Sequence, residues 1–231
     1  AAEHRLHAFL QDLAVLMGRA ERRHWAAMYI RGLLLDGERQ SIEPMAARLP
    51  GADVQALRQF VNQSPWPWFP VQEALARKVV DELLPEAAYI VDETSFPKQG
   101  HHSVGVARQY SGTLGRSDNC QVRVPAHYVD RVFDWPISGS LYLPKEWVTD
   151  RERRTKAQVP RRIALQTKGQ IALELVDEGL QAGIPTRAIA VDAGYGDQPV
   201  LLDGLEKRGL PYVVWMASTV RFRRAQAVEE D

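Results

Sequence analysis

Two stretches of the sequence, residues 88–92 (AYIVD) and 188–192 (AIAVD), share one pattern, a short apolar run that ends in an aspartate. Runs of this length and composition predict strands that are buried on both faces of a sheet. An aspartate that ends such a strand must be hydrogen-bonded, bound to a metal or solvated, because an unpaired buried charge is costly. The two stretches therefore predict the centre of a sheet and a candidate site whose acids are Asp92 and Asp192.

The sequence around these stretches predicts the rest of the sheet. Apolar, β-rich runs at 87–94, 102–110 and 120–129 predict three consecutive antiparallel strands. The sequence after these runs predicts an irregular charged segment over residues 131–165 and then a helix over 167–183. A strand over 187–194, a second helix over 198–209 and a second strand over 211–216 follow. The predicted fold class is α/β, a mixed sheet of three antiparallel strands followed by two parallel strands with helices.

Residues 1–86 have helical periodicity instead. Apolar positions spaced by three and four predict one or two helices over 4–35. Residues 42–62 predict a helix, a tight turn and a second helix with Asp53 as its N-cap, an arrangement that can serve DNA binding. A connector rich in proline precedes a further helix that is expected to end at Pro85. We therefore expect a helical DNA-binding domain over 1–86 and a second domain over 87–231.

Composition limits the classes of function. With 45% hydrophobic and 25% charged residues the chain is expected to fold, and it lacks the run of about 18 to 20 apolar residues that a membrane span needs. The first residues lack the apolar segment of a signal peptide, so a cytoplasmic protein without a membrane partner is expected. Because Cys120 is the only cysteine of the sequence, no structural zinc site is expected with His101 and His102. Because 29 basic residues balance 29 acidic ones, any DNA binding must come from local patches.

A pair of carboxylates brought together favours a divalent cation, which removes their repulsion and positions phosphate oxygens. Two such ions can activate a water or a 3′-hydroxyl and stabilise the leaving oxygen, which is phosphodiester chemistry. The alternative is that each aspartate only caps the turn that follows it. Other motifs fail: Thr94 stands where a phosphoaspartyl hydrolase needs a second aspartate, and the glycines of residues 194–196 are too close for a nucleotide fingerprint.

Residues 91–122, VDETSFPKQGHHSVGVARQYSGTLGRSDNCQV, closely resemble the first catalytic block of bacterial insertion-sequence transposases of the DDE endonuclease superfamily. The resemblance is nearest to the insertion sequence seven-hundred-and-one type. It covers nearly the whole chain, through LYLPKEW, DRERR, VDAGYGD and YIRGLLLDGERQSIEPMAARL.

The resemblance implies a ribonuclease-H-like catalytic domain in which Asp92 and Asp192 are catalytic and bind Mg²⁺ or Mn²⁺. It also implies an enzyme that cuts and joins DNA ends by metal-dependent hydrolysis and strand transfer, and that assembles as a homo-oligomer on the terminal repeats and target DNA. Such enzymes need a third acid beyond an inserted segment, so the domain is expected to be incomplete, with Glu229 or Glu230 as the candidate substitute in this chain. The alternatives are a truncated or domesticated derivative that binds DNA or a partner without catalysis, and an interaction module without nucleic acid.

Clusters of basic residues are the candidates for binding phosphates. The densest cluster lies in the charged segment, and the others lie in the helical region and behind Asp92. The predicted DNA-binding residues are Arg153, Arg154, Lys156, Arg161, Arg162, Arg22, Arg23 and Lys98. Each cluster has the alternative reading of a solvated face.

Overall fold

The computed structural model describes residues 2–37, 39–80, 88–216 and 218–219. The chain divides into two compact units, Ala1–Leu75 and Ala76–Asp231. The domain boundary expected near residue 86, and the helix end expected at Pro85, lie outside the described residues.

The first unit contains the helices α1 (Ala2–Leu16), α2 (Ala20–Leu33), α3 (Ile42–Ala47), α4 (Val54–Asn62) and the start of α5 (Trp68–Val80). Gly18, at φ +75°, separates α1 from α2. The core of this unit is formed by Leu13, Met17, Ala26, Phe60 and Val71, against which Trp66 packs. The turn expected between 42 and 62 lies between α3 and α4, and the Asp53 carboxylate accepts a hydrogen bond of 2.7 Å from the Ala56 amide as the predicted N-cap.

The second unit is built on a seven-stranded mixed sheet. Its strands are β1 (Ala88–Val91), β2 (Thr94–Pro97), β3 (Ala107–Ser111), β4 (Arg116–Val129), β5 (Asp134–Leu141), β6 (Ala188–Val191) and β7 (Tyr212–Val214). β4 is the longest strand and pairs antiparallel with four others, β1, β2, β3 and β5. On the other side of β1, β6 and then β7 add in parallel. The predicted α/β class with antiparallel and then parallel strands is confirmed at this level.

The segment 131–165 was wrongly expected to be irregular. It contains the strand β5 and the helices α6 (Lys145–Thr149) and α7 (Arg151–Lys156). The sequence of β5, DWPISGSL, carries proline and glycine, which disfavour a strand, but β5 pairs with β4 over nearly its whole length. The register shifts next to Pro136, so the proline stands beside a bulge, where its missing amide is tolerated.

Two other strand predictions also need correction. The run at 102–110 forms a strand only from Ala107, because Gly105 at φ +78° lies in a turn. The run at 87–94 is divided, since β1 ends at Val91 and β2 begins at Thr94. The strand that pairs with β4 on the side away from β1 is β5, and β2 and β3 are short strands on the other part of β4.

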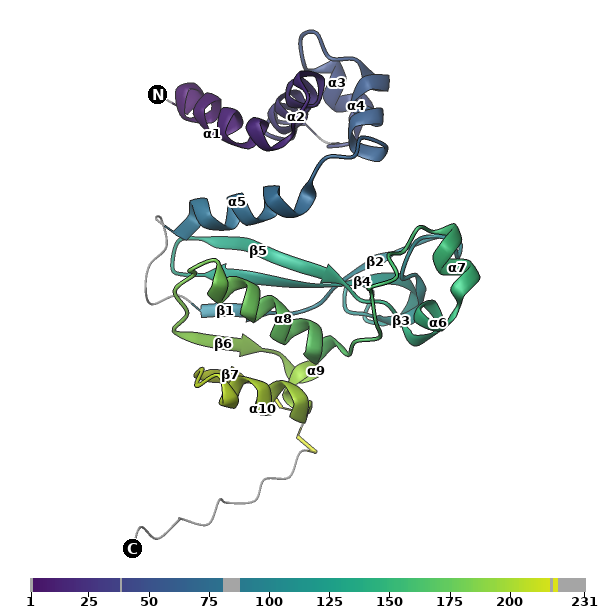
Figure 1. Ribbon diagram of the computed structural model, residues 1–231, viewed down its shortest axis with the longest axis vertical. Coiled ribbons are helices and arrows are strands. Elements are labelled where there is room, and N and C mark those ends of the chain that lie inside the picture. The colour runs from purple at the N-terminus through teal and green to yellow at the C-terminus, as the bar shows by residue number, and fades with distance from the viewer. Residues whose placement is uncertain (1, 38, 81–87, 217, 220–231) are drawn as a thin grey trace, which may run out of the picture. The chain divides into compact units, whose positions relative to one another are not determined.

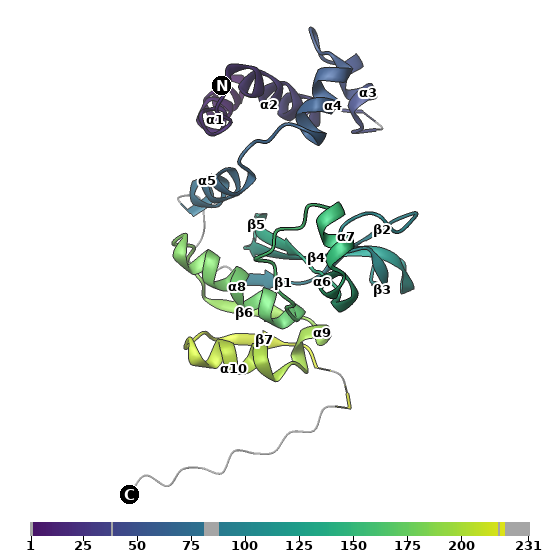
Figure 2. The same ribbon diagram turned by 45° about the vertical axis from the view of Figure 1, so that its right-hand side comes forward.

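Two helices cover one face of this sheet. They are α8 (Lys168–Gln181) and α10 (Pro199–Lys207), which contact each other and lie side by side in Figures 1 and 2. The core beneath them includes Tyr89, Val91, Ile189, Leu175 and Leu201, all almost fully buried. Between β6 and α10, residues Ala193–Gly196 form the short helix α9. No helix in the described part of the chain is long and apolar enough to pass through a bilayer.

Candidate functional site

The positions of Asp92 and Asp192 follow from the pairing of β1 with β6. These strands are parallel and adjacent, and Val91 lies opposite Val191 as the last pair of the register. Both valines are buried in the core, at 0% and 4% exposure, so the ends of the strands are fixed. Figure 1 shows β1 and β6 side by side. The residue after each strand is an aspartate, and the two acids therefore leave the sheet at the same edge. This arrangement agrees with the prediction from the sequence that Asp92 and Asp192 lie close together.

Backbone amides orient both carboxylates. The Glu93 amide donates to Oδ1 of Asp92 over 2.6 Å, and the Gly194 amide donates to Oδ1 of Asp192 over 3.0 Å. In the described residues no side chain donates a hydrogen bond to either carboxylate. Asp192 therefore caps the short helix α9, as the alternative reading expected, whereas Asp92 accepts from the amide of the next residue, where no turn forms. The side chains of both acids remain open to an incoming cation.

The two carboxylates are electrostatically coupled. Partial burial raises the pKa of Asp192, and the nearby negative charge of Asp92 raises it further, while the amide of Gly194 lowers it. A smaller contribution in the same direction comes from Glu93. Negative charge is thus concentrated at this edge of the sheet, and a divalent cation would relieve the repulsion.

Tyr195 of α9 contacts the backbone of Asp92. Its side chain is buried, at 1% exposure, and its hydroxyl donates to the backbone carbonyl of Asp92 over 3.4 Å. Burial and the charges of Glu93, Asp92 and Asp192 raise its pKa well above the usual range, so the phenol stays protonated. Tyr195 therefore links the loop after β6 to the end of β1. The sequence alone did not indicate this role, because it shows Tyr195 only as a tyrosine between two glycines.

Beside Asp92, the Glu93 carboxylate forms an ion pair with the ammonium group of Lys168, the first residue of α8. About a quarter of each side chain is exposed. The Lys168 ammonium also lies 5.5 Å from the centre of the Tyr142 ring, within the range of a cation–π contact. Neither Glu93 nor Lys168 was selected from the sequence, because only the fold brings residues so far apart in the chain together.

The candidates for the third acid of a complete site do not lie among the described residues. Glu229 and Glu230 both fall in the undescribed residues 220–231. Within the described ranges, no group of three or more histidine, cysteine, aspartate or glutamate residues is placed to hold a metal ion. The candidate site consequently has two identified carboxylates.

The predicted DNA-binding residues of α7 have different surroundings. Arg154 donates to three backbone carbonyls, those of Val148, Pro160 and Ile163, at 2.7 to 3.2 Å. Arg153 lies 3.7 Å from the centre of the Trp147 ring and donates to the carbonyl of His101 over 2.6 Å. Arg154 therefore fixes the fold around α7. Lys156 is exposed and makes no ion pair with another described residue.

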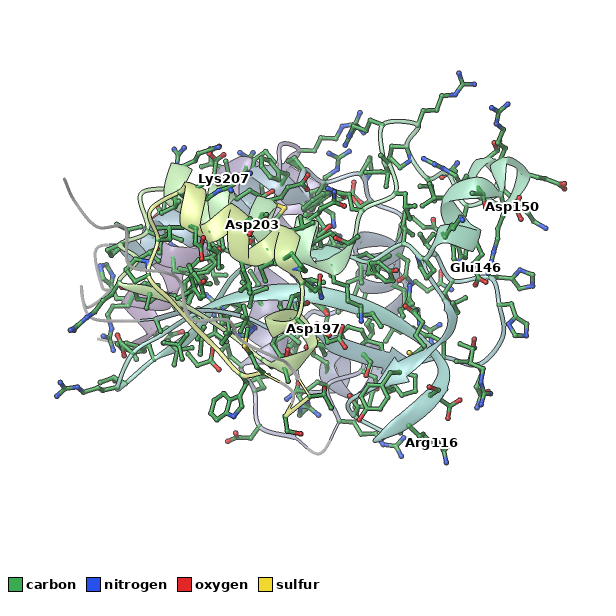
Figure 3. All side chains as sticks on the ribbon, turned by 90° about the horizontal axis from the view of Figure 1, so that it is seen from below. Arg116, Glu146, Asp150, Asp197, Asp203 and Lys207 are labelled. Carbon is green, nitrogen blue, oxygen red and sulfur yellow. The ribbon has the colours of Figure 1, made fainter. Side chains whose placement is uncertain are left out.

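Arg153 and Lys156 line a groove of about 760 Å³, here called the α7 groove. Its polar lining residues are His101, His102, Arg108, Asp118, Asn119, Glu146, Asp150, Glu152, Arg153 and Lys156. The groove carries both signs of charge. Figure 3 shows Glu146 and Asp150 on a different part of the unit from Asp197, the residue that follows α9, so the α7 groove is separate from the carboxylate pair.

The remaining predicted residues lie elsewhere on the surface. Arg161 and Arg162 follow α7 and are exposed, and so is Lys98, which lies in the loop after β2. In the first unit, Arg23 is exposed and the half-buried Arg22 lines a small hollow of about 180 Å³ between α2 and α4. The structure thus brings Arg153 and Lys156 to one groove and leaves Arg161, Arg162 and Lys98 outside that lining.

The sheet order β5-β4-β1-β6-β7, with acids at the ends of β1 and β6, is consistent with the ribonuclease-H-like class of nucleic-acid enzymes. The family description of DDE superfamily endonucleases matches residues 9–230, and the chain belongs to this family. Among known proteins, it is 26% identical over 190 residues to the "Probable transposase for insertion sequence element IS701" of Microchaete diplosiphon. The matched region covers 81% of this chain and 47% of that protein, so the chain spans about half the length of the relative.

Proposed function

We propose that this protein is a DDE-type DNA transposase that cuts and joins DNA ends, with Asp92 and Asp192 as its catalytic carboxylates. The observation that carries the proposal is the register of β1 and β6, which ends in these two acids at one edge of the sheet. Membership of the DDE superfamily endonucleases supports it. So does the likeness to a relative described as a probable insertion-sequence transposase.

The residues at this edge fit a hard divalent cation, because such ions prefer carboxylate oxygens. One oxygen of each aspartate faces a backbone amide, and no side-chain donor of the described residues competes for the carboxylates. DDE superfamily endonucleases generally use divalent metal ions, and we propose Mg²⁺ or Mn²⁺ here, held by Asp92 and Asp192. When bound, such an ion activates a water or 3′-hydroxyl and stabilises the leaving oxygen. Glu229 remains the candidate for a further ligand.

The chain's own residues prepare this site. The amides of Glu93 and Gly194 aim the two carboxylates, and the neutral phenol of Tyr195 holds the backbone of Asp92 in place. The Lys168 ammonium pairs with Glu93 and so offsets part of the negative charge that this acid brings to the pair. These contacts fix the orientation of the carboxylates before substrate binds, which lowers the cost of reaching a productive geometry.

For DNA we propose two regions of contact. In the second unit, Arg153, Lys156, Arg161, Arg162 and Lys98 would bind phosphates of the DNA. Lys156 supports this role best, since it is exposed at the α7 groove and has no ion-pair partner among the described residues.

In the first unit, α3 and α4 with Arg22 and Arg23 would bind the terminal repeats of the element. We further propose that two copies of the protein bind paired DNA ends as a homo-oligomer.

A second candidate function is occupation of DNA or a partner without cutting. One observation favours it: the described residues contain two identified site carboxylates and no group of three potential metal ligands. This candidate predicts DNA binding that weakens as salt rises, without Mg²⁺-dependent nicking.

One experiment separates the two candidates. Nicking of a plasmid that carries the element's ends is measured with Mg²⁺ for the wild type and for the Asp92→Ala, Asp192→Ala and Asp203→Ala variants. Asp203 is an exposed acid on α10 and serves as the matched control (Figure 3). We expect nicking by the wild type and the control, and none by either site variant, with DNA binding retained in all four. Nicking by either site variant would overturn the assignment, and absence of nicking by the wild type would favour the binding function.

A further inference from the structure

The first turn of α8 contacts both loops that carry the carboxylates. Toward Asp92, Lys168 pairs with the neighbouring Glu93. Toward Asp192, the Gly169 amide donates to Oε1 of Gln198 over 3.0 Å, and Nε2 of Gln198 donates to the carbonyl of Gly194 over 2.7 Å. The Gly194 amide in turn donates to the Asp192 carboxylate. A continuous chain of contacts therefore runs from Glu93 through α8 to Asp192.

The start of α8 is a firm anchor for these contacts. Thr167 and Gln170 form a reciprocal capping box, in which the Thr167 hydroxyl accepts from the Gln170 amide and the Gln170 side chain accepts from the Thr167 amide. The next turn is held in the core by Ile171 and Ala172, which are almost fully buried. A hydrogen bond to this turn thus fixes a loop relative to the sheet core.

We propose that Gln198 is a positioning residue, which holds the loop after β6 against α8 and so sets the place of the Asp192 carboxylate relative to Asp92. The inference rests on the proposed function of that pair. A glutamine suits the role because its amide both accepts and donates, and it meets one amide and one carbonyl here. Side chains that hold metal ligands from behind are commonly as important to the site as the ligands themselves.

Gly169 offers a way to break the same link without touching Gln198. A Cβ at position 169 would lie 2.5 Å from Oε1 of Gln198, closer than atoms can approach, and the amide at the end of that flexible side chain would have to move away. Its other near neighbour, Cβ of Leu201, would stand at an ordinary 3.4 Å. Alanine also favours a helix over glycine, so Gly169→Ala should not weaken α8 itself.

The test is Mn²⁺ binding, measured by electron paramagnetic resonance on the full chain for the wild type, Gln198→Leu, Gly169→Ala and Gln181→Leu. Gln181 is an exposed glutamine at the far end of α8 and is the matched control. Neither Gln198→Leu nor Gly169→Ala changes the net charge of the protein, so electrostatics alone predicts no change in its affinity for Mn²⁺. We expect about tenfold to a hundredfold weaker binding in Gln198→Leu and Gly169→Ala, and binding within about twofold of the wild type in the control.

Thermal unfolding of each variant accompanies the titration. A purely structural loss would lower the melting temperature of Gly169→Ala, whereas the positioning role predicts weaker Mn²⁺ binding at an unreduced melting temperature. Wild-type affinity in either link variant would overturn the role of Gln198. If the proposed function itself were wrong, the result would differ from these outcomes. Mn²⁺ binding would then be missing in the wild type or would survive in an Asp92→Asn, Asp192→Asn double variant.

Discussion

Gly196, four residues after Asp192, offers the sharpest test of how the loop after β6 is packed. A Cβ at this position would lie 2.1 Å from the backbone carbonyl oxygen of Trp215 and 3.1 Å from its carbon. Trp215 follows β7 and is itself tied to β6, since its amide donates to the carbonyl of Val191 over 3.1 Å. Gly196→Ala therefore forces α9 and the end of β7 apart, and no flexible side chain is available to move instead.

The magnitude follows from two opposing contributions. Overpacking against rigid structure costs typically about 1 to 3 kcal/mol, and a backbone clash of this size lies at the upper end. The lower backbone entropy of unfolded alanine offsets up to about 1 kcal/mol. We expect Gly196→Ala to lower the free energy of unfolding by about 2 kcal/mol, measured by urea denaturation followed by circular dichroism. The control is Gly112→Ala, whose Cβ would meet nothing within 4 Å and whose effect should stay within about 0.5 kcal/mol. Equal stability of the two variants would refute the placement of α9 against β7.

Three further predictions concern other contacts of the second unit. Arg154→Met should destabilise the unit by about 1 to 3 kcal/mol in urea denaturation, because three backbone carbonyls lose their donor; unchanged stability would contradict this. Tyr89→Phe should cost about 1 kcal/mol in the same measurement, because the buried hydroxyl that donates to the Leu175 carbonyl over 2.7 Å is removed; a cost near zero would argue against the bond. Arg208 lowers the pKa of Asp177, so their half-exposed ion pair stabilises the fold above the ordinary carboxyl pKa of about 3.9 and loses that effect as pH falls through the lower folded value. Asp177→Asn should therefore cost less than about 1 kcal/mol at pH 7, and the cost should shrink as pH falls below about 3.9; a pH-independent difference would rule the linkage out.

The sequence was most informative where a strand or helix is specified by its own residues. β1 and β6 were predicted because apolar runs on buried strands leave a clear signal, and α8 because its apolar positions repeat with the helical period. β5 was missed because its proline, glycine and serines carry no such signal. Its structure depends on pairing with β4, a contact between segments that local patterns do not report.

The same distinction applies to the candidate site. Asp92 and Asp192 could be selected because each ends a recognisable strand, and parallel pairing then brings them together. Gln198 and Lys168 could not be selected, since Gln198 meets Gly169, and Lys168 meets Glu93, only through tertiary packing. The phosphate contact predicted for Arg154 from its charge stays a prediction, and a count of charges did not indicate that its guanidinium group donates to backbone carbonyls.

The central claim, that Asp92 and Asp192 together bind a divalent cation, is tested most directly by the stability of the chain with and without Mg²⁺. A ligand that binds only the folded state at a hundred times its Kd adds about 2.7 kcal/mol to the free energy of unfolding. We predict a gain of this kind for the wild type and none for an Asp92→Asn, Asp192→Asn double variant. The apo form of the double variant should be at least as stable as the wild type, because burial and the charge of Asp92, which raise the pKa of Asp192, no longer act on a carboxylate there. An equal gain from Mg²⁺ in the double variant, or no gain in the wild type, would contradict the claim.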